Sequence, residues 1–563
     1  MYIKQLRVFG FKKFSHLEVD FSSGINIIVG DNDSGKSTLL EAIVAVLNGQ
    51  YRGVSLSRSL SEDLFNNKNV FSYLSKLKSG EQCEPPEILI EAVFGGADDD
   101  DVVALFEGDA NSRGARESGV SLRIALDYDS FAEEYREFVD SRKCSGIPIE
   151  YYNCSWNTFA RKITRPAAIK FKASLISGGS SLVWSNSRAV VSRITRDVLD
   201  LNDQIAVSQA HRRIREIFAS DEDVSKINKK ISDKTRSLTR KNVSLGFEAS
   251  TVNSWESGIV TKLENIPFAN VGDGAKSIVS TDLALLKSGD RERDVLLLEE
   301  PENHLSHTKL NMLLNDVLKR YGGKQLIVTT HSSFVANKLE LRNLILLNGD
   351  NSLRLSSLSE STWSFFMKAP GYKTLRVLLC DVAILVEGDA DELVVQRAYR
   401  DTHDGKLPID DGIDVISVGT SFLRFMEIAK RVNKNVVAVT DNDGDIEALK
   451  KKYKNYTFIT SEKAREAQQV VSYAEQVLPE GEMQGVNYNT LESEIYASAG
   501  VEALNNILTK VTKDRDQSLK YMENNKTDVA LAIFDAKDCI QYPQYIMRAI
   551  EWAYDKVKVD EDV

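Results

Sequence analysis

Residues 25–38 read INIIVGDNDSGKST, and this stretch decides the fold of the first part of the chain. An apolar run that predicts a strand leads into a glycine-containing loop, then into Lys36-Ser37, and residues 39–47 continue with a helical pattern. Strand, glycine loop, Lys-Ser and helix make up a phosphate-binding loop in its required order. We therefore expect a nucleotide site here and not a plain glycine-rich turn.

The residue types of this loop suit phosphate. Glycines let the backbone curl so that successive N–H groups face one anion, and the start of the helix adds its positive dipole end. We expect Lys36 to reach the β- and γ-phosphates of ATP and Ser37 to hold Mg²⁺. The expected nucleotide-binding residues are Gly30, Asn32, Asp33, Ser34, Gly35, Lys36, Ser37 and Thr38.

Composition indicates a multidomain globular protein. The chain has 563 residues, of which 42% are hydrophobic and 27% charged. Its formal net charge is −11, so any nucleic-acid binding has to use a local basic groove or a bound metal ion. The five cysteines are scattered without metal-ligand spacing, which favours reduced thiols and a cytoplasmic location. No signal-peptide core and no apolar run of roughly 20 residues is found, so we expect no membrane partner.

Other stretches of the first half also predict secondary structure. Residues 87–94 predict a strand, and the acidic residues 98–101 that follow predict a solvated turn. Residues 196–245 carry apolar residues at helical spacing with dense Arg and Lys. This stretch predicts a helical insertion that provides dimer contacts or a scaffold.

Polar and acidic residues follow two further buried-type strands. Residues 295–298 lead into Glu299 and Glu300, and residues 326–329 lead into Thr330 and His331. Glu299 can reach a Mg²⁺ ion held by Ser37, and Glu300 can orient the attacking water, which suffices for phosphoryl transfer. His331 can contact the γ-phosphate, and Glu302 is an alternative to Glu300.

A second α/β domain is predicted after about residue 375, because strands alternate with helical patterns at 382–386, 413–418 and 436–440. Carboxylates follow the first and third strands: Glu387, Asp391 and Glu392, then Asp441, Asp443 and Asp445. Such an oxygen-rich edge suits Mg²⁺ or Mn²⁺, and two such ions can hydrolyse a phosphodiester. The alternative is a pair of acidic turns.

The first half resembles an ABC-type ATPase head of the kind found in SMC, RecF and OLD proteins. The resemblance rests on the phosphate loop, the Glu-Glu-Pro-Glu-Asn segment and Thr-His-Ser. It implies that Glu299 takes the Walker B place, Glu300 is the catalytic glutamate and His331 the switch histidine. Residues 271–276 precede a helix and resemble the degenerate signature segment of OLD proteins, and Gln82 is a weak Q-loop candidate.

The second half resembles a Toprim domain. The resemblance implies that Glu387 is its first glutamate, Gly419 closes its second strand, and Asp441 and Asp443 are its paired aspartates, with Asp391 and Asp445 as further metal ligands. Residues 491–496 resemble a later segment of OLD nucleases, which makes Glu492 an additional ligand. Lys526 falls where those nucleases carry a late lysine, and Lys520 is the alternative.

An ABC-type head followed by a Toprim domain is the layout of the OLD family of nucleases. We therefore expect an α/β fold with an ATPase head interrupted by a helical insertion, then a C-terminal Toprim domain. The expected domains are 1–175 and 246–375 for the ATPase, 176–245 for the insertion and 376–563 for the Toprim part.

The resemblance implies an ATP-regulated, Mg²⁺- or Mn²⁺-dependent DNA endonuclease that self-assembles through its ATPase half. Many members of the family act in bacterial defence against phage, beside a helicase, a reverse transcriptase or another subunit. Two alternatives stay open: a non-catalytic DNA clamp or scaffold, and a topoisomerase- or primase-like Toprim enzyme.

Overall fold

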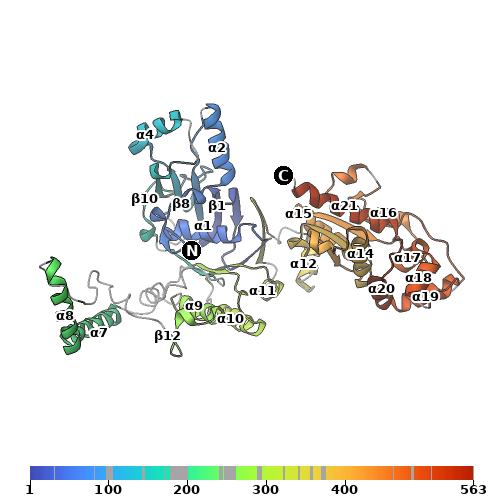
Figure 1. The fold of residues 1–563 in the computed structure, drawn as a ribbon. Helices are drawn as coiled ribbons and strands as arrows, with labels where there is room; N and C mark the ends of the chain where they lie inside the picture. Colours follow the sequence, from blue (N-terminus) through green and yellow to red (C-terminus); the bar gives the residue numbers. More distant parts are fainter. Residues whose placement is uncertain are drawn as a thin grey trace. The chain divides into compact units, whose positions relative to one another are not determined.

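The computed structural model shows two compact units, one formed by residues 1–26 and 35–330, the other by residues 27–34 and 331–563 (Figure 1). It describes the chain apart from residues 31, 82, 97–104, 142–145, 170, 178–200, 240–244, 246–261, 288–294, 321–323, 340–342, 355–358, 369–375, 461, 483–486, 509, 562 and 563. None of the helices in the described part is both long and apolar enough to span a bilayer. The acidic turn at 98–101 and Gln82 lie outside the described residues.

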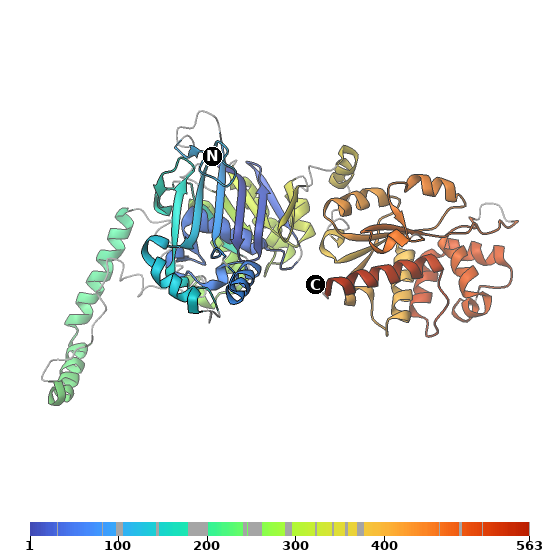
Figure 2. The same ribbon diagram turned by 90° about the horizontal axis from the view of Figure 1, so that it is seen from above.

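The first unit contains an antiparallel sheet with the strand order β10-β9-β8-β6-β1-β2 (Figure 2). Its strands are β1 (Tyr2–Phe11), β2 (Phe14–Asp20), β6 (Ile88–Gly95), β8 (Glu117–Leu126), β9 (Tyr152–Thr158) and β10 (Ile163–Thr164), with the short β7 (Glu107–Gly108) paired to β8. The strand expected at 87–94 is thus confirmed as β6. Arg7 lies fully buried in this sheet, where it pairs with Glu91 at 3.3 Å and Glu117 at 2.7 Å, so its charge is compensated.

Parallel strands carry the motif-bearing residues of the first unit. Strands β11 (Ala173–Ser177), β14 (Val295–Glu299) and β15 (Gln325–Thr329) pair in parallel in this order. Helix α1 (Lys36–Asn48) packs against both β6 of the antiparallel sheet and β14. The buried side chain of Gln325 exchanges two 2.8 Å hydrogen bonds with the backbone of Ile3, which joins the two strand layers.

Further elements complete this unit. The helices are α2 (Asn67–Ser79), α4 (Tyr128–Ser141), α9 (Asp273–Lys287) and α10 (His307–Arg320), and two short hairpins pair β4 (Gln50–Tyr51) with β5 (Val54–Ser55) and β12 (Lys262–Leu263) with β13 (Ile266–Pro267). The segment 271–276 does not simply precede a helix as expected, because α9 already begins at Asp273 within it.

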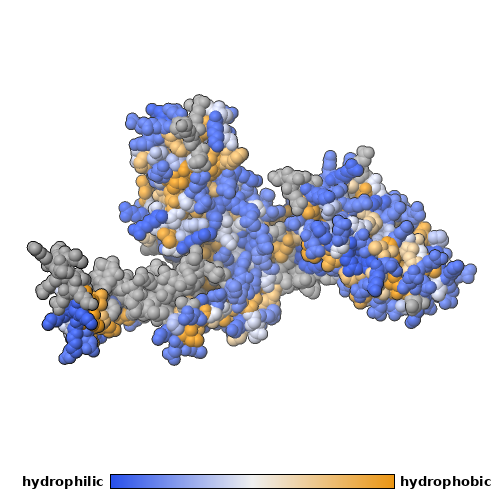
Figure 3. Space-filling model, viewed as in Figure 1, coloured by the Kyte–Doolittle hydropathy of each residue, from blue (hydrophilic) through white to orange (hydrophobic). Residues whose placement is uncertain are grey.

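The helices expected within residues 196–245 are present as α7 (Leu201–Ser220) and α8 (Glu222–Thr239), which pack against each other. Several of their apolar side chains are exposed: Ile205, Ile214, Ile217 and Ile227. Figure 3 shows hydrophobic orange surface beside hydrophilic blue at the position of α7 and α8. A helix pair with exposed isoleucines has an apolar face that this unit alone does not bury.

In the second unit, β3 (Ile25–Val29) pairs in parallel with β16 (Leu344–Asn348), which pairs antiparallel with β17 (Asn351–Arg354). Helices α11 (Ser333–Lys338) and α12 (Glu360–Lys368) also belong to it. The strand expected at 25–29 is therefore confirmed, and the phosphate loop leaves its carboxyl end.

A five-stranded parallel sheet forms the rest of the second unit, with the order β19-β18-β20-β22-β21. Its strands are β18 (Val382–Val386), β19 (Ile413–Ser417), β20 (Asn435–Thr440), β21 (Thr457–Phe458) and β22 (Gln469–Tyr473). The helices are α14 (Asp389–Thr402), α15 (Phe422–Arg431), α16 (Ile446–Lys452), α17 (Leu491–Ala499), α18 (Val501–Ile507), α19 (Arg515–Asn524), α20 (Lys526–Asp535) and α21 (Gln544–Glu561). Each predicted strand of this α/β region is confirmed.

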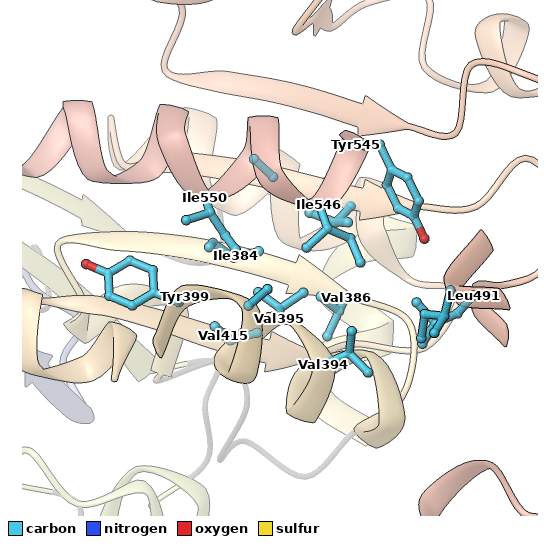
Figure 4. Close-up of a cluster of buried hydrophobic side chains, with 14 of the residues drawn as sticks. Ile384, Val386, Val394, Val395, Tyr399, Val415, Leu491, Tyr545, Ile546 and Ile550 are labelled. Atoms are coloured by element: carbon cyan, nitrogen blue, oxygen red, sulfur yellow. The ribbon is translucent and has the colours of Figure 1, made fainter. Parts of the chain in front are cut away.

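Buried aliphatic side chains explain this arrangement. Val386 at the end of β18 packs in one cluster with Val394 of α14, Leu491 of α17 and Ile546 of α21 (Figure 4). The cluster lies on one face of the sheet, whereas α15 and α16 lie on the other (Figure 2). Packing on both faces explains why the strands are apolar throughout, and it leaves the carboxyl ends of the strands for polar residues.

Candidate functional site

The described residues of the loop after β3 have backbone features that suit a phosphate-binding loop. Gly35 has φ 98°, and a Cβ there would lie 2.5 Å from the Phe14 ring. At Gly30 a Cβ would lie 2.3 Å from the carbonyl oxygen of Leu347. Asp33 also has positive φ, at 67°. Left-handed residues two apart in a short loop turn backbone N–H groups toward one side, which is how such loops hold an anion.

The loop runs into the start of α1 without a break. Lys36 and Thr38 are buried, whereas Ser37 is exposed. The N-terminus of α1 has Gly35 at its cap position, no side-chain cap bond and no acidic residue in its first turn. Its amide groups and positive dipole end thus meet no carboxylate from α1 itself, which suits a phosphate ligand.

The two glutamates after β14 are held differently. Glu299 is the last residue of β14, opposite Thr329 of β15. Glu300 follows with φ 42°, a strained value for a non-glycine residue, while its backbone N–H donates to the Thr329 carbonyl at 2.9 Å. Its Oε2 accepts a 2.7 Å hydrogen bond from Nδ2 of Asn303. The alternative, Glu302, accepts a 2.7 Å bond from the hydroxyl of Thr330 on its Oε1, so each glutamate has one carboxylate oxygen held by a neighbouring side chain.

Two other expected ATPase residues have defined positions. His331 directly follows Thr330 at the carboxyl end of β15, and its side chain is partly buried. Gly274, in the first turn of α9, lies where a Cβ would come 2.5 Å from the carbonyl oxygen of His304. The signature-like segment 271–276 therefore packs directly on the turn that follows Glu300.

In the second unit, Glu387 is the first residue after β18 and is exposed. Its backbone carbonyl accepts a 2.9 Å bond from the N–H of Gly419, which has φ 61°. Asp391 lies in the first turn of α14, and its Oδ2 accepts a 3.0 Å bond from the N–H of Gly388. The turn after β18 and the end of β19 are thus fixed next to each other.

The turn after β20 is fixed by Asn442, between the paired aspartates. Its buried side chain donates to the carbonyl oxygens of Ala474 and Gln476 at 2.9 and 2.8 Å, and accepts from the N–H of Gly444 at 2.9 Å. Asp443 adopts φ 47° and accepts a 3.2 Å bond from Asn487. Because Asn442 is tethered on both sides, the carboxylates of its two neighbours have fixed starting points at the edge of the sheet.

Glu492 and Lys526 reach the same region from two helices. Glu492 lies in the first turn of α17 and is 3% exposed. Its Oε1 lies 3.4 Å from the Nζ atom of Lys526, the first residue of α20. Lys520, the alternative, is an exposed residue of α19. The structure therefore brings Lys526 next to one of the expected ligands.

Electrostatics show that the expected carboxylates act on one another. Burial raises the pKa of Asp441 to about 8, and the charges of Asp443, Glu387, Asp391 and Glu492 add to the shift. Burial likewise raises the pKa of Asp391 to about 6, where Glu492 and Glu387 contribute and the bond from Gly388 opposes. These five residues form what we call the carboxylate cluster. Its ionised state needs positive charge from outside the cluster.

Two oxygens of the cluster lack hydrogen-bond partners. Within the described residues, Asp441 Oδ1 and Glu492 Oε2 are buried acceptors with no hydrogen-bond partner. A buried carboxylate oxygen without a partner is costly, and a cation is the ligand that would satisfy it. As the described side chains stand, no three His, Cys, Asp or Glu groups are already arranged around one ion. Carboxylates that repel one another stay apart unless a cation offsets their charge.

Two neighbouring acids are used structurally. Asp445 is exposed and caps α16, with its Oδ1 accepting from the N–H of Ala448 at 2.9 Å. Glu392 accepts from the N–H of Ser417 at 3.2 Å and pairs with Arg376 at 3.4 Å. Neither is among the charges that shift the pKa of Asp441.

Tyr545 is a site neighbour that the sequence did not indicate. It lies in the first turn of α21, and its carbonyl accepts a 2.6 Å bond from Ser472 of β22. Figure 4 shows its ring near Leu491, at the end of the core where β18 finishes. Burial raises its pKa well above the usual value, with Asp391 and Asp441 as the next contributors, so the phenol stays protonated beside the cluster. Only the folded chain brings Tyr545 near Asp441, and no local signal marks it.

Comparisons with known proteins match both halves. A family model for an AAA domain matches residues 5–250, and a model for the TOPRIM domain of overcoming-lysogenization-defect-like proteins matches residues 378–443. The chain is 24% identical over 355 residues to the DNA replication and repair protein RecF of Oenococcus oeni, covering 56% of this chain and 90% of that protein. It is 37% identical over 92 residues to the structural maintenance of chromosomes protein 3 homolog of Plasmodium falciparum, which is 14% of this chain and 8% of that protein.

A solved structure of the recombination mediator protein RecF with ATP is also similar, with a TM-score of 0.33 and 13% identity over 63% of this chain and 97% of that chain. The phosphate loop lies within the residues that the first family model matches. The carboxylates Glu387, Asp441 and Asp443 lie within the residues that the second model matches. The chain thus carries an AAA-type ATPase domain followed by an OLD-like TOPRIM domain, which together match an ATPase–Toprim fusion of the OLD family.

Proposed function

We propose that the protein is an ATP-hydrolysing, divalent-metal-dependent DNA endonuclease. The observation that carries this proposal is the carboxylate cluster, in which buried oxygens of Asp441 and Glu492 lack a partner within the described residues and Lys526 lies beside Glu492. A merely structural cluster would have these oxygens hydrogen-bonded, because burying them bare is costly.

The cluster provides the ligands for the cation. Glu387, Asp441 and Asp443 would hold Mg²⁺ or Mn²⁺, with Asp391 and Glu492 completing the oxygen shell. The bound ions would supply an activated water and charge compensation for a phosphodiester. Asp441 starts with a raised pKa and gives up its proton when the ion binds.

Lys526 is placed to act on the substrate. Its Nζ pairs with Glu492, and its side chain is about half exposed, so it can contact DNA and the cluster together. A lysine beside the leaving oxygen offsets the negative charge that develops there.

The ATPase domain would use the residues at the ends of its strands. Lys36 and the loop amides hold the phosphates, Ser37 and Glu299 hold Mg²⁺, Glu300 positions water and His331 contacts the γ-phosphate. Asn303 orients Glu300 through their 2.7 Å bond. ABC-type sites of this kind are completed by a second head, so we propose a homodimer or higher oligomer formed through the ATPase half.

The two alternatives are less well supported. A DNA clamp that only binds would not need a cluster whose buried Asp441 has a pKa near 8. A topoisomerase needs a tyrosine that reaches DNA, whereas Tyr545 and Tyr453, whose pKa values are raised by burial and by carboxylates of the cluster, are 3% and 1% exposed. We also propose a cytoplasmic role in bacterial defence against phage, beside a helicase, a reverse transcriptase or another subunit, on the resemblance to OLD proteins alone.

The test is a plasmid assay with the whole chain. Supercoiled plasmid is incubated with Mg²⁺ or Mn²⁺, each with and without ATP, and the Asp443→Ala variant is run beside the wild type. We expect metal-dependent nicked or linear products that fall by roughly 100-fold or more in the variant, while its ATP hydrolysis persists. Wild-type-like cutting by Asp443→Ala would remove the nuclease assignment from this site. Bound but intact DNA would favour the clamp, and an altered linking number the topoisomerase.

A further inference from the structure

Two helices on one face of the TOPRIM sheet end in basic residues. The last turns of α15 and α16, with the residue that follows Tyr453, carry six exposed cations: Lys430, Arg431, Lys450, Lys451, Lys452 and Lys454. We call this set the lysine face. It contrasts with a chain whose net charge is −11.

The connections of the sheet place both helices on the same face. The chain runs from β19 through α15 to β20, and from β20 through α16 to β21, in the same direction across the sheet. Since such crossovers are right-handed, both helices cover one face, and Figure 2 shows them there, opposite α21. Both run antiparallel to the strands, so their basic last turns point away from the edge that carries the carboxylate cluster and toward the amino ends of the strands.

Few carboxylates oppose these cations. Helices α15 and α16 contain only Glu427 and Glu447 as acids. Glu427 is already engaged, since it accepts from the N–H and hydroxyl of Ser359, both at 2.9 Å, and from the hydroxyl of Thr362 at 2.5 Å. Lys450, Lys451 and Lys454 form no ion pair with any carboxylate that the structure describes.

Stabilisation of the helix ends is not a sufficient reason for this charge. A lysine in the last turn of a helix contributes about 0.3–1 kcal/mol through the dipole, and α16 is a single short helix that Asp445 already caps. Four lysines within five positions repel one another, which offsets that gain. Lys452, which lies 5.2 Å from the ring centre of Tyr453, has a packing role that the other three lack.

The length of α16 relates the lysine face to the carboxylate cluster. Helix α16 begins directly after the turn that carries Asp441 and Asp443, and its seven residues rise by ~10 Å. Three base-pair steps of duplex DNA cover about the same distance, at ~3.4 Å per step. Resting on the proposed nuclease function, we propose that the lysine face binds the phosphate backbone of duplex DNA roughly three base pairs from the bond that is cut.

The test compares two triple variants of the whole chain. Lys450, Lys451 and Lys454 are changed to Gln, with Lys452 kept for its packing. The matched control changes Lys68, Lys76 and Lys78 to Gln, which are exposed lysines of α2, two of them also in a last helical turn. Binding of a 30-base-pair DNA duplex is measured without divalent metal over a series of salt concentrations.

We expect the first variant to bind DNA at least about 10-fold more weakly at low salt, with the slope of log Kd against log salt reduced by roughly 2–3. The α2 variant should keep the wild-type Kd and slope, and both should hydrolyse ATP normally. An Arg triple at the same three α16 positions should restore binding, since it restores charge, and would separate lost contacts from lost folding. Equal Kd and slope for the wild type and the α16 Gln variant would overturn the proposal.

The two hypotheses fail separately. If the wild type binds DNA through these lysines but never cuts it with Mg²⁺ or Mn²⁺, the lysine face stands and the nuclease proposal falls. If wild type and the α16 Gln variant cut and bind alike, the nuclease stands and the lysine face is wrong. Binding of an RNA duplex but not of DNA would also overturn the proposal.

Discussion

Lys526 and Glu492 form an ion pair with 3.4 Å between Nζ and Oε1, although one opens α20 and the other lies in the first turn of α17. The glutamate side chain is 4% exposed and the lysine 52%. Burial works against the lysine charge, but Glu492 and Asp391 outweigh it and raise the pKa of Lys526. A permanent cation therefore faces the carboxylate cluster on one side and solvent on the other.

The ion pair with Glu492 distinguishes Lys526 from Lys520, the two lysines that the sequence left as alternatives. Lys526→Ala should lower DNA cleavage by roughly 100-fold, because charge compensation at the leaving oxygen is lost. Lys520→Ala should leave cleavage unchanged, since Lys520 is an exposed residue of α19. Single-turnover cleavage rates at saturating metal decide the point. Equal losses of cleavage in the two variants would show that Lys526 does not act at the leaving oxygen.

Variants of Asp445 test whether its carboxylate binds a metal ion or only caps helix α16. Its Oδ1 accepts from the N–H of Ala448, and Asn caps helices as well as Asp does. Asp445→Asn should therefore keep both the thermal midpoint and metal-dependent cleavage, whereas Asp445→Ala should lower the midpoint and cost about 1 kcal/mol. A loss of cleavage in the Asn variant with an unchanged midpoint would make Asp445 a metal ligand after all.

Glu300 and Glu302 can be compared in the same way. Glu300→Gln should bind ATP normally but hydrolyse it roughly 100-fold more slowly, because the carboxylate that positions water is lost. Glu302→Gln should turn over near the wild-type rate, since an amide oxygen can still accept the bond from Thr330. Phosphate release under excess ATP gives both numbers. Unchanged turnover in the Glu300 variant would move the catalytic role to Glu299 or Glu302.

Assembly should depend on the insertion. Ile214 and Ile217 of α7 are 57% and 68% exposed, and changing both to Glu would place charge on the apolar face. Light scattering should then give a smaller mass than for the wild type, while Ile163→Glu, at an exposed site of β10, should not change it. A wild-type monomer at micromolar concentration, with and without ATP, would contradict the proposed assembly.

The sequence predicted what depends on local patterns. Strands β3, β14, β18 and β20 could be located because continuous apolar runs end in polar motifs, and a buried parallel strand has this signature. The phosphate loop and the paired aspartates could be found for the same reason. The start of α9 was misplaced, because residues 271–276 were expected to precede the helix, whereas the backbone is already helical at Asp273.

Contacts between distant residues could not be predicted. Asn442 fixes the aspartate turn through Ala474 and Gln476, and Tyr545 reaches the cluster from about a hundred residues downstream. The sequence also could not separate acids that share one motif. Asp445 caps a helix while Asp443 points to the cluster region, and only packing and hydrogen bonding distinguish them.

The pKa of Asp441 makes metal binding and stability depend on pH. In the metal-free protein this pKa is about 8, raised by burial and by neighbouring carboxylates, whereas an unfolded Asp titrates near 3.9. Between these values the native state binds more protons than the unfolded state. The contribution of Asp441 to stability is therefore fully present below pH 4, falls as the pH rises to about 8, and is constant above it.

Addition of Mg²⁺ should reverse this loss, since the ion binds the ionised carboxylate and displaces the proton. We expect the rise in thermal midpoint on adding about 10 mM Mg²⁺ to be larger at pH 8.5 than at pH 6. Calorimetry in buffers of different ionisation enthalpy should detect proton release below pH 8. Asp441→Asn should strongly reduce both effects and leave the smaller contribution of Asp391, and Asp404→Asn, at an exposed position of the same unit, should change neither. A Mg²⁺-induced shift that does not change with pH in the wild type would show that Asp441 does not bind the ion.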